Sequence, residues 1–180
     1  LQKNNTNRIM EIFFENPTKR FQLRELARAS KMSTTGAKSA LLELLEDNLI
    51  ARTKEKKYEY YEANKDDITY KIVKKFFNIK TFYDVGLIDF LEKRLNHPEA
   101  IFLFGSSARG EDAERSDVDI FVLTSVKKDL DLGMFRKKLK RDIKLLIMNK
   151  DEFEKAKNKS PELVKNIVNG VNLRGFLEVV

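Results

Sequence analysis

The sequence has 180 residues, of which 42% are hydrophobic, and its net charge of +7 is spread along the chain, so charge alone does not identify a polyanion as its partner. It has no cysteine, which excludes disulfides, zinc–thiolate sites and thiol nucleophiles. No uncharged run reaches the roughly 20 residues of a membrane span and no secretion signal is visible, so we expect a cytoplasmic protein with no membrane partner.

Three short helices are expected in the first fifty residues. Apolar residues recur at helical spacing from Ile9, from Leu23 and from Leu41. Ser33 is a good N-cap for a third helix that begins at Thr34. The connection between the second and third helices is short, which predicts a helix-turn-helix arrangement.

A β-hairpin is expected directly after these helices. Residues 49–53 and 58–61 are rich in strand-forming side chains and flank a charged tip at residues 54–57. Asn48 precedes the hairpin, and asparagine tolerates the left-handed conformation that would end the third helix.

Residues 3–63 resemble the winged helix-turn-helix domains of bacterial and archaeal transcription regulators, mainly through residues 23–27 and 41–50. In such domains the third helix enters the major groove and the hairpin, or wing, contacts the DNA backbone. The resemblance therefore implies DNA as a partner, with contacts from Thr34, Thr35, Lys38 and Ser39 in the helix and from Lys54, Lys56 and Lys57 in the wing. A role of this module in protein contacts stays open, including formation of a homodimer.

Residues 65–98 are expected to form a helical linker. Apolar residues recur at helical spacing from Ile68 to Phe77 and again from Leu87 to Leu95, with Asp84 as the candidate cap of the second helix. We expect these apolar faces to pack in cores or between domains and not to bind a cofactor.

A glycine-serine turn follows the first of two short apolar runs, residues 100–104 and 120–124. Both runs are too short for helices and are rich in strand-forming side chains. Gly105 would end the first strand and let the backbone approach a phosphate, while the Ser106 hydroxyl and nearby amides can donate hydrogen bonds to phosphate oxygens. The turn therefore predicts a phosphate-binding site.

Two carboxylates precede the second of these strands. Asp117 and Asp119 lie two residues apart, so on a strand they point to the same side. Neighbouring carboxylates repel each other unless a hard divalent cation lies between them, and Mg²⁺ is the natural occupant. The pair therefore predicts a magnesium site beside the phosphate-binding turn.

The spacing of Gly-Ser, ten residues and Asp-x-Asp before a hydrophobic strand resembles the minimal nucleotidyltransferases of the DNA polymerase β superfamily. This resemblance implies that Asp117 and Asp119 are catalytic metal ligands and that Gly105, Ser106 and Arg109 bind the nucleotide. The residue pattern of the remaining chain predicts a basic amphipathic helix at 132–140, a strand at 142–148 and two short helices at 150–157 and 161–169, so a mixed sheet flanked by helices is expected. The basic cluster of Lys137, Lys138, Lys140 and Arg141 is expected to be a solvated face.

The sequence differs from active family members at the position of their third carboxylate. Lys144 stands at the corresponding position, and Asp142 lies on the same face of the expected strand, about 6 to 7 Å away. One alternative is a slow enzyme in which Asp142 replaces the missing catalytic acid. The other is that Lys144 neutralises the two aspartates and leaves a nucleotide sensor without turnover.

The sequence thus predicts an α+β protein with a winged helix-turn-helix domain (1–64), a helical linker (65–98) and a minimal nucleotidyltransferase domain (99–180). The expected reaction is transfer of a nucleoside monophosphate, AMP from Mg-ATP, to a hydroxyl. A co-encoded protein such as a HEPN toxin is a candidate acceptor. The alternative is a DNA-binding regulator whose nucleotidyltransferase fold senses nucleotide or a partner.

Overall fold

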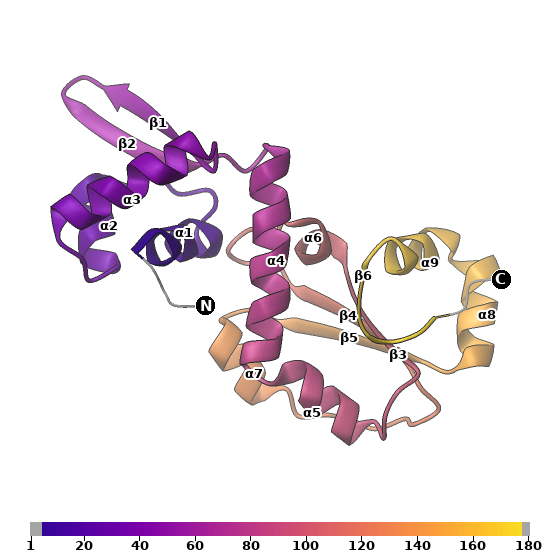
Figure 1. Cartoon of the computed structure of the whole chain (residues 1–180). Helices are drawn as coiled ribbons and strands as arrows, with labels where there is room; N and C mark the ends of the chain where they lie inside the picture. The colour runs from indigo at the N-terminus through magenta and orange to yellow at the C-terminus, as the bar shows by residue number, and fades with distance from the viewer. Residues whose placement is uncertain (1–4, 178–180) are drawn as a thin grey trace. The chain divides into compact units, whose positions relative to one another are not determined.

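The computed structural model describes residues 5–177 and divides the chain into two compact units, Leu1–Lys74 and Lys75–Val180 (Figure 1). The division falls inside helix α4 (Ile68–Asp84), so the residues expected to form a separate linker are shared between the two units. Within the described residues no helix is both long and apolar enough to span a membrane.

The first unit consists of three helices followed by an antiparallel hairpin. The elements are α1 (Asn5–Glu15), α2 (Leu23–Ala29), α3 (Thr34–Glu46), β1 (Ile50–Glu55) and β2 (Tyr58–Ala63). The Ser33 side chain accepts a hydrogen bond from the Gly36 amide at 3.1 Å, which confirms the predicted N-cap of α3. Asn48 has a φ of 57°, which confirms the left-handed residue expected after that helix.

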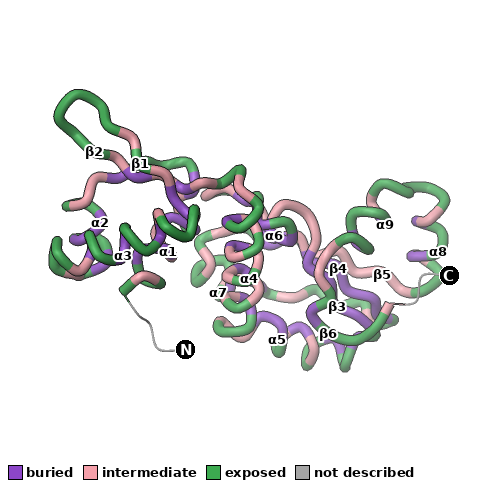
Figure 2. The backbone as a smooth tube through the Cα atoms, turned by 45° about the horizontal axis from the view of Figure 1, so that its top comes forward, coloured by how far each residue is buried: buried purple, intermediate pink, exposed green. Residues whose placement is uncertain are grey.

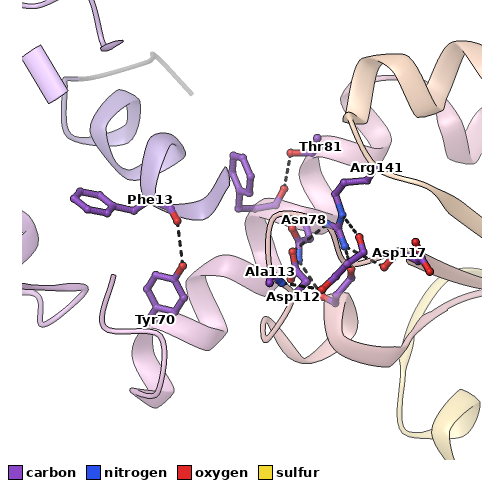
Figure 3. Close-up of polar contacts among 11 residues, drawn as sticks. Phe13, Tyr70, Asn78, Thr81, Asp112, Ala113, Asp117 and Arg141 are labelled. Atoms are coloured by element: carbon purple, nitrogen blue, oxygen red, sulfur yellow. Dashed lines mark hydrogen bonds and ion pairs between the residues drawn. The ribbon is translucent and has the colours of Figure 1, made fainter. Parts of the chain in front are cut away.

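Buried aromatic and aliphatic side chains hold the first unit together. Phe13 is completely buried and meets the ring of Phe21 edge to face, with 5.6 Å between ring centroids. Phe21 in turn forms a backbone bridge with Tyr61, which attaches β2 to the helices. Tyr70, at the start of α4, is also completely buried, and its hydroxyl donates to the carbonyl of Phe13 at 3.4 Å (Figure 3).

The second unit is built on a four-stranded sheet with the order β5-β4-β3-β6. Its strands are β3 (Ala100–Phe104), β4 (Val118–Leu123), β5 (Ile143–Met148) and β6 (Val171–Gly175). Its helices after α4 are α5 (Leu87–Arg94), α6 (Gly105–Arg109), α7 (Gly133–Leu139), α8 (Lys150–Lys159) and α9 (Pro161–Val168). Strand β3 is antiparallel to β4 and β6, whereas β4 and β5 are parallel, so the predicted mixed sheet is confirmed.

Alternating side chains of the central strands pack on opposite faces of this sheet. In β3, Ile101 and Leu103 join the core covered by α5 and α7, while Ala100 and Phe102 join the core covered by α8 and α9. Figure 2 shows that β3 and β4 are mostly buried. A one-residue slip of either strand would reverse this pattern, so the packing fixes the register that places the residues at the strand ends.

One predicted helix boundary is wrong. Asp84 does not cap α5, because it is the last residue of α4 and forms an ion pair with Lys80. The N-cap of α5 is Gly86, whose φ of 79° turns the chain between the two helices. Leu87 and Leu91 of α5 are completely buried, so this helix belongs to the core of the second unit.

Candidate active site

The site begins where β3 ends, beside the start of β4. Phe104, the last residue of β3, pairs with Asp119 across the antiparallel ladder. Gly105 follows with a φ of +72°, and a Cβ atom at this position would lie 2.4 Å from Oδ2 of Asp119. A glycine is therefore required on two grounds, the left-handed backbone and the carboxylate that lies against it.

Gly105 starts a helix and does not simply end a strand in a turn. The helix α6 has only five residues, a little more than one turn. Such a segment is too short to show an apolar periodicity, which explains why the sequence predicts only a turn here. The half-buried Ser106 lies in this turn of helix, and its carbonyl accepts hydrogen bonds from the amides of Gly110 and Glu111.

Lys144 contacts one of the two carboxylates directly. The parallel ladder between β4 and β5 places Lys144 opposite Asp119. Its Nζ lies 2.6 Å from Oδ2 of Asp117, and the lysine side chain remains 69% exposed. The structure therefore brings together Gly105, Asp117, Asp119 and Lys144 at one edge of the sheet.

The charges at this edge act on one another. Burial raises the pKa of the Asp119 carboxyl above its ordinary value, and the negative charge of Asp117 acts in the same direction. The cations Lys144 and Arg141 oppose this rise. The hydrogen bond and charge of Asp117 raise the pKa of Lys144, so the lysine remains a cation beside the pair. One lysine charge compensates only half of the charge of two ionised carboxylates.

The two other predicted site residues have partners elsewhere. Nε of the exposed Arg109 lies 2.7 Å from Oε2 of Glu111. Oδ1 of Asp142 lies 3.0 Å from Nε of Arg136, and the Asp142 side chain is 69% exposed. Both side chains would have to exchange these partners before they could act on a nucleotide.

The donor set fits a cation that is shared with a substrate. Mg²⁺ in enzymes is often held by one or two carboxylates together with phosphate oxygens and water. Asp117 and Asp119 supply two carboxylates, and among residues 5–177 no cluster of three or more acidic, histidine or cysteine side chains suits a metal ion. These two aspartates could therefore hold Mg²⁺ that arrives with a nucleotide, provided that Lys144 releases Asp117.

Two comparisons with known proteins found a match. Residues 86–174 match the family model of polymerase beta nucleotidyltransferases. This segment is a nucleotidyltransferase domain. The chain is also similar to the crystal structure of a candidate nucleotidyltransferase from Sulfolobus solfataricus, with 18% identity over 61% of this chain and 94% of that one and a TM-score of 0.32. No curated protein matches the sequence.

The second unit also contains a buried polar group that sequence reasoning missed. Arg141 was expected to lie on a solvated basic face, but its side chain is only 12% exposed and pairs with Asp112, which is 4% exposed. Asn78 and Ser107 complete this group. No local pattern marks these residues, because their partners lie about thirty residues away along the chain.

The residues expected to contact DNA all lie in the first unit. Thr34, Thr35, Lys38 and Ser39 are exposed on α3. Three exposed lysines lie on the hairpin. Lys54 belongs to β1, and Lys56 and Lys57 form the turn. Lys56 has a φ of 56°, the left-handed conformation of a tight turn.

Proposed function

We propose that the nucleotidyltransferase domain transfers a nucleoside monophosphate, in the simplest case AMP from Mg-ATP, to a hydroxyl group. The acceptor oxygen forms a bond to the α-phosphorus, the bond from that phosphorus to the bridging oxygen breaks, and pyrophosphate leaves. The observation that carries the proposal is the pair of Asp117 and Asp119, with Asp119 lying against Gly105, within a segment that matches nucleotidyltransferases.

Each residue of the site has a definite part in this proposal. Asp117 and Asp119 would hold Mg²⁺, which supplies charge neutralisation for the phosphates. Ser106 would donate a hydrogen bond to a phosphate oxygen. Arg109 would exchange Glu111 for a phosphate. Asp142 is the candidate base that accepts the proton of the acceptor hydroxyl, after release from Arg136.

The acceptor that we propose is a hydroxyl of a partner protein encoded beside this chain, such as a toxin of the HEPN type. The resemblance to minimal nucleotidyltransferases supports this choice. A gene neighbour that encodes a small helical protein would strengthen it, whereas an isolated gene with an inverted repeat upstream would favour autoregulation.

A second candidate function is favoured by the contact between Lys144 and Asp117. An ammonium 2.6 Å from the carboxylate already compensates part of the charge that a metal ion would neutralise. In this alternative the domain binds nucleotide or a partner without turnover and acts as the sensor of a DNA-binding regulator. The two functions differ in whether AMP becomes covalently attached to an acceptor.

Mass spectrometry after incubation with Mg-ATP, with and without a co-encoded partner, distinguishes them. We expect the wild type to add the mass of AMP, Asp142→Asn to lose this transfer, and Lys144→Asp to increase it. Lys150→Asp is a control with the same change of net charge as Lys144→Asp, because Lys150 is likewise exposed, at 72%, and pairs with Glu99 at 2.8 Å. Binding of nucleotide without transfer by any form would refute the enzyme and favour the sensor.

For the first unit we propose DNA binding as a winged helix. The helix-turn-helix, the hairpin and the exposed side chains of α3 support the proposal. Exchange of Lys54, Lys56 and Lys57 for glutamine should flatten the slope of log affinity against log salt by up to about 3 units on a mixed-sequence duplex. Thr35→Ala should mainly relax sequence preference.

The control for this measurement replaces three exposed lysines of the nucleotidyltransferase domain, Lys137, Lys138 and Lys140, by glutamine. This variant has the same net charge as the hairpin variant, so equal slopes for the two would show that the hairpin has no special role. Undetectable duplex binding at low salt would assign the first unit to protein contacts.

A further inference from the structure

Arg141 lies beside Asp117 and connects segments that are distant in the sequence (Figure 3). Its guanidinium donates to Oδ2 of Asp112 at 3.0 Å and to Oγ of Ser107 at 2.6 Å. It also donates to two main-chain carbonyls, those of Ser116 at 2.7 Å and of Asp117 at 3.1 Å. One side chain thus binds α6, the loop after it and the residues that lead into β4.

Asn78 of α4 completes this buried group from the opposite side of the Asp112 carboxylate. Its Nδ2 donates to Oδ1 of Asp112 at 2.7 Å and to the carbonyl of Ser107 at 3.1 Å. Asn78 and Asp112 are each 4% exposed, and Ser107 is completely buried. Both carboxylate oxygens of Asp112 therefore have partners, so the group is well satisfied in the interior of the second unit.

We propose that Arg141 is a positioning residue of the transfer site, which fixes the Ser116–Asp117 main chain against α6 and so sets Asp117 and Asp119 beside Gly105. Its effect on nucleotide binding rests on the proposed function, whereas its effect on the main chain does not.

The need for such precise positioning follows from the site itself. Oδ2 of Asp119 occupies the space that a side chain at residue 105 would fill, so a small shift of the start of β4 moves the carboxylate against the α6 backbone or away from it. The Val118 amide donates to the Asp142 carbonyl at 2.8 Å. The backbone just before β5 therefore also fixes the start of β4.

The choice of arginine also favours a geometric role. A buried ion pair adds little net stability compared with apolar side chains of similar size. A guanidinium, however, presents donors in a rigid planar fork, and here it reaches two side chains and two carbonyls at once. Lysine would keep the charge and lose this arrangement.

The test separates positioning from simple neutralisation of Asp112. Arg141→Met alone leaves a buried carboxylate uncompensated and should strongly lower the melting temperature. The double variant Asp112→Asn, Arg141→Met removes both charges and keeps an acceptor for Asn78, so it should recover most of that loss. Arg141→Lys provides a second route if the double variant does not fold.

Two readouts are made on the full chain. Hydrogen exchange at the Ser116 and Val118 amides should be at least about tenfold faster in the double variant and in Arg141→Lys, with the Phe153 amide of α8 unchanged. The affinity for Mg-ATP, measured by calorimetry, should fall about 10- to 100-fold, as is usual when a residue that orients metal ligands is lost. The variant Glu92→Gln, Arg174→Met removes another pair of the domain and should change neither readout.

The outcomes are distinct. A folded double variant with wild-type exchange and wild-type Mg-ATP affinity overturns the inference and leaves Arg141 as the counter-charge of Asp112. Failure of the wild type to bind Mg-ATP refutes the proposed function, and in that case the exchange rates alone decide whether Arg141 fixes the main chain.

Discussion

Gly105→Ala perturbs the carboxylate site at its tightest point. An alanine Cβ would lie 2.4 Å from Oδ2 and 3.3 Å from Cγ of Asp119, on a backbone with a φ of +72°. Since these atoms belong to a side chain, either the carboxylate rotates or the start of α6 moves. Both responses change the position of Asp119 relative to Asp117, so we expect a loss of function as well as of stability.

Gly86 is a matched control in the same domain. Its φ is +79°, and a Cβ atom built there meets nothing within 4 Å. An alanine in the left-handed conformation costs about 1–2 kcal/mol. Alanine also lowers the conformational entropy of the unfolded chain relative to glycine, which offsets about 0.4–1 kcal/mol of this cost. Gly86→Ala should therefore lower the free energy of unfolding by about 0–1.6 kcal/mol. It should leave the affinity for Mg-ATP unchanged.

Gly105→Ala has the same backbone cost and, in addition, the displaced carboxylate. We expect it to be more destabilising than Gly86→Ala in thermal unfolding followed by circular dichroism. By calorimetry, its affinity for Mg-ATP should be lower by about tenfold or more. In an Asp119→Ala background the obstruction is gone, so the two glycine substitutions should become equally destabilising. Equal stability and equal Mg-ATP affinity of the two single variants would refute this reasoning.

Further predictions concern stability. Ser33→Ala should destabilise the first unit by about 1 kcal/mol through loss of the α3 cap, with Ser39→Ala as the control. Tyrosine fluorescence can follow this unit, since four of the five tyrosines lie in residues 58–70; equal urea midpoints would contradict the cap. Hydrogen bonds from the start of α4 lower the pKa of Asp67, so its contribution is present above the unfolded pKa of about 3.9 and is lost as pH falls through the folded value. The difference in urea midpoint between wild type and Asp67→Ala should shrink with acid, and a constant difference would oppose this assignment. Leu91→Ala should cost about 2–5 kcal/mol if α5 belongs to the core, and a change below about 1 kcal/mol would indicate a peripheral helix.

Local chemistry made much of the fold predictable from the sequence. The Ser33 cap and the left-handed Asn48 depend on neighbouring backbone, so they can be recognised from a few residues. Strands β3 and β4 are short apolar runs with strand-forming side chains, so they too can be recognised from local sequence. In contrast, Asp84 fits a helix cap by residue type, but a glycine in a left-handed conformation starts α5 two residues later.

The candidate site was predictable only in part, for a physical reason. Asp117 and Asp119 lie on the same strand end, so their proximity follows from a spacing of two residues. The ion pair of Arg141 with Asp112 and that of Asp142 with Arg136 depend on how separate segments pack. Whether a basic residue is solvated or buried is decided by such tertiary contacts, so Arg141 looked like its exposed neighbours in the sequence.

Lys144 determines the charge of the site and therefore its preference for ligands. With a carboxylate in its place the site would present three negative charges, whereas with lysine beside Asp117 and Asp119 it presents a net charge of about −1 when both aspartates are ionised. Free Mg²⁺ has to compete with an ammonium that is already bound to Asp117. A nucleotide changes this competition, because its phosphates give the exposed lysine side chain an alternative partner while they bring their own metal ion. We therefore expect a low affinity for Mg²⁺ alone and a higher affinity for Mg-ATP. In Lys144→Asp these two affinities should lie closer together.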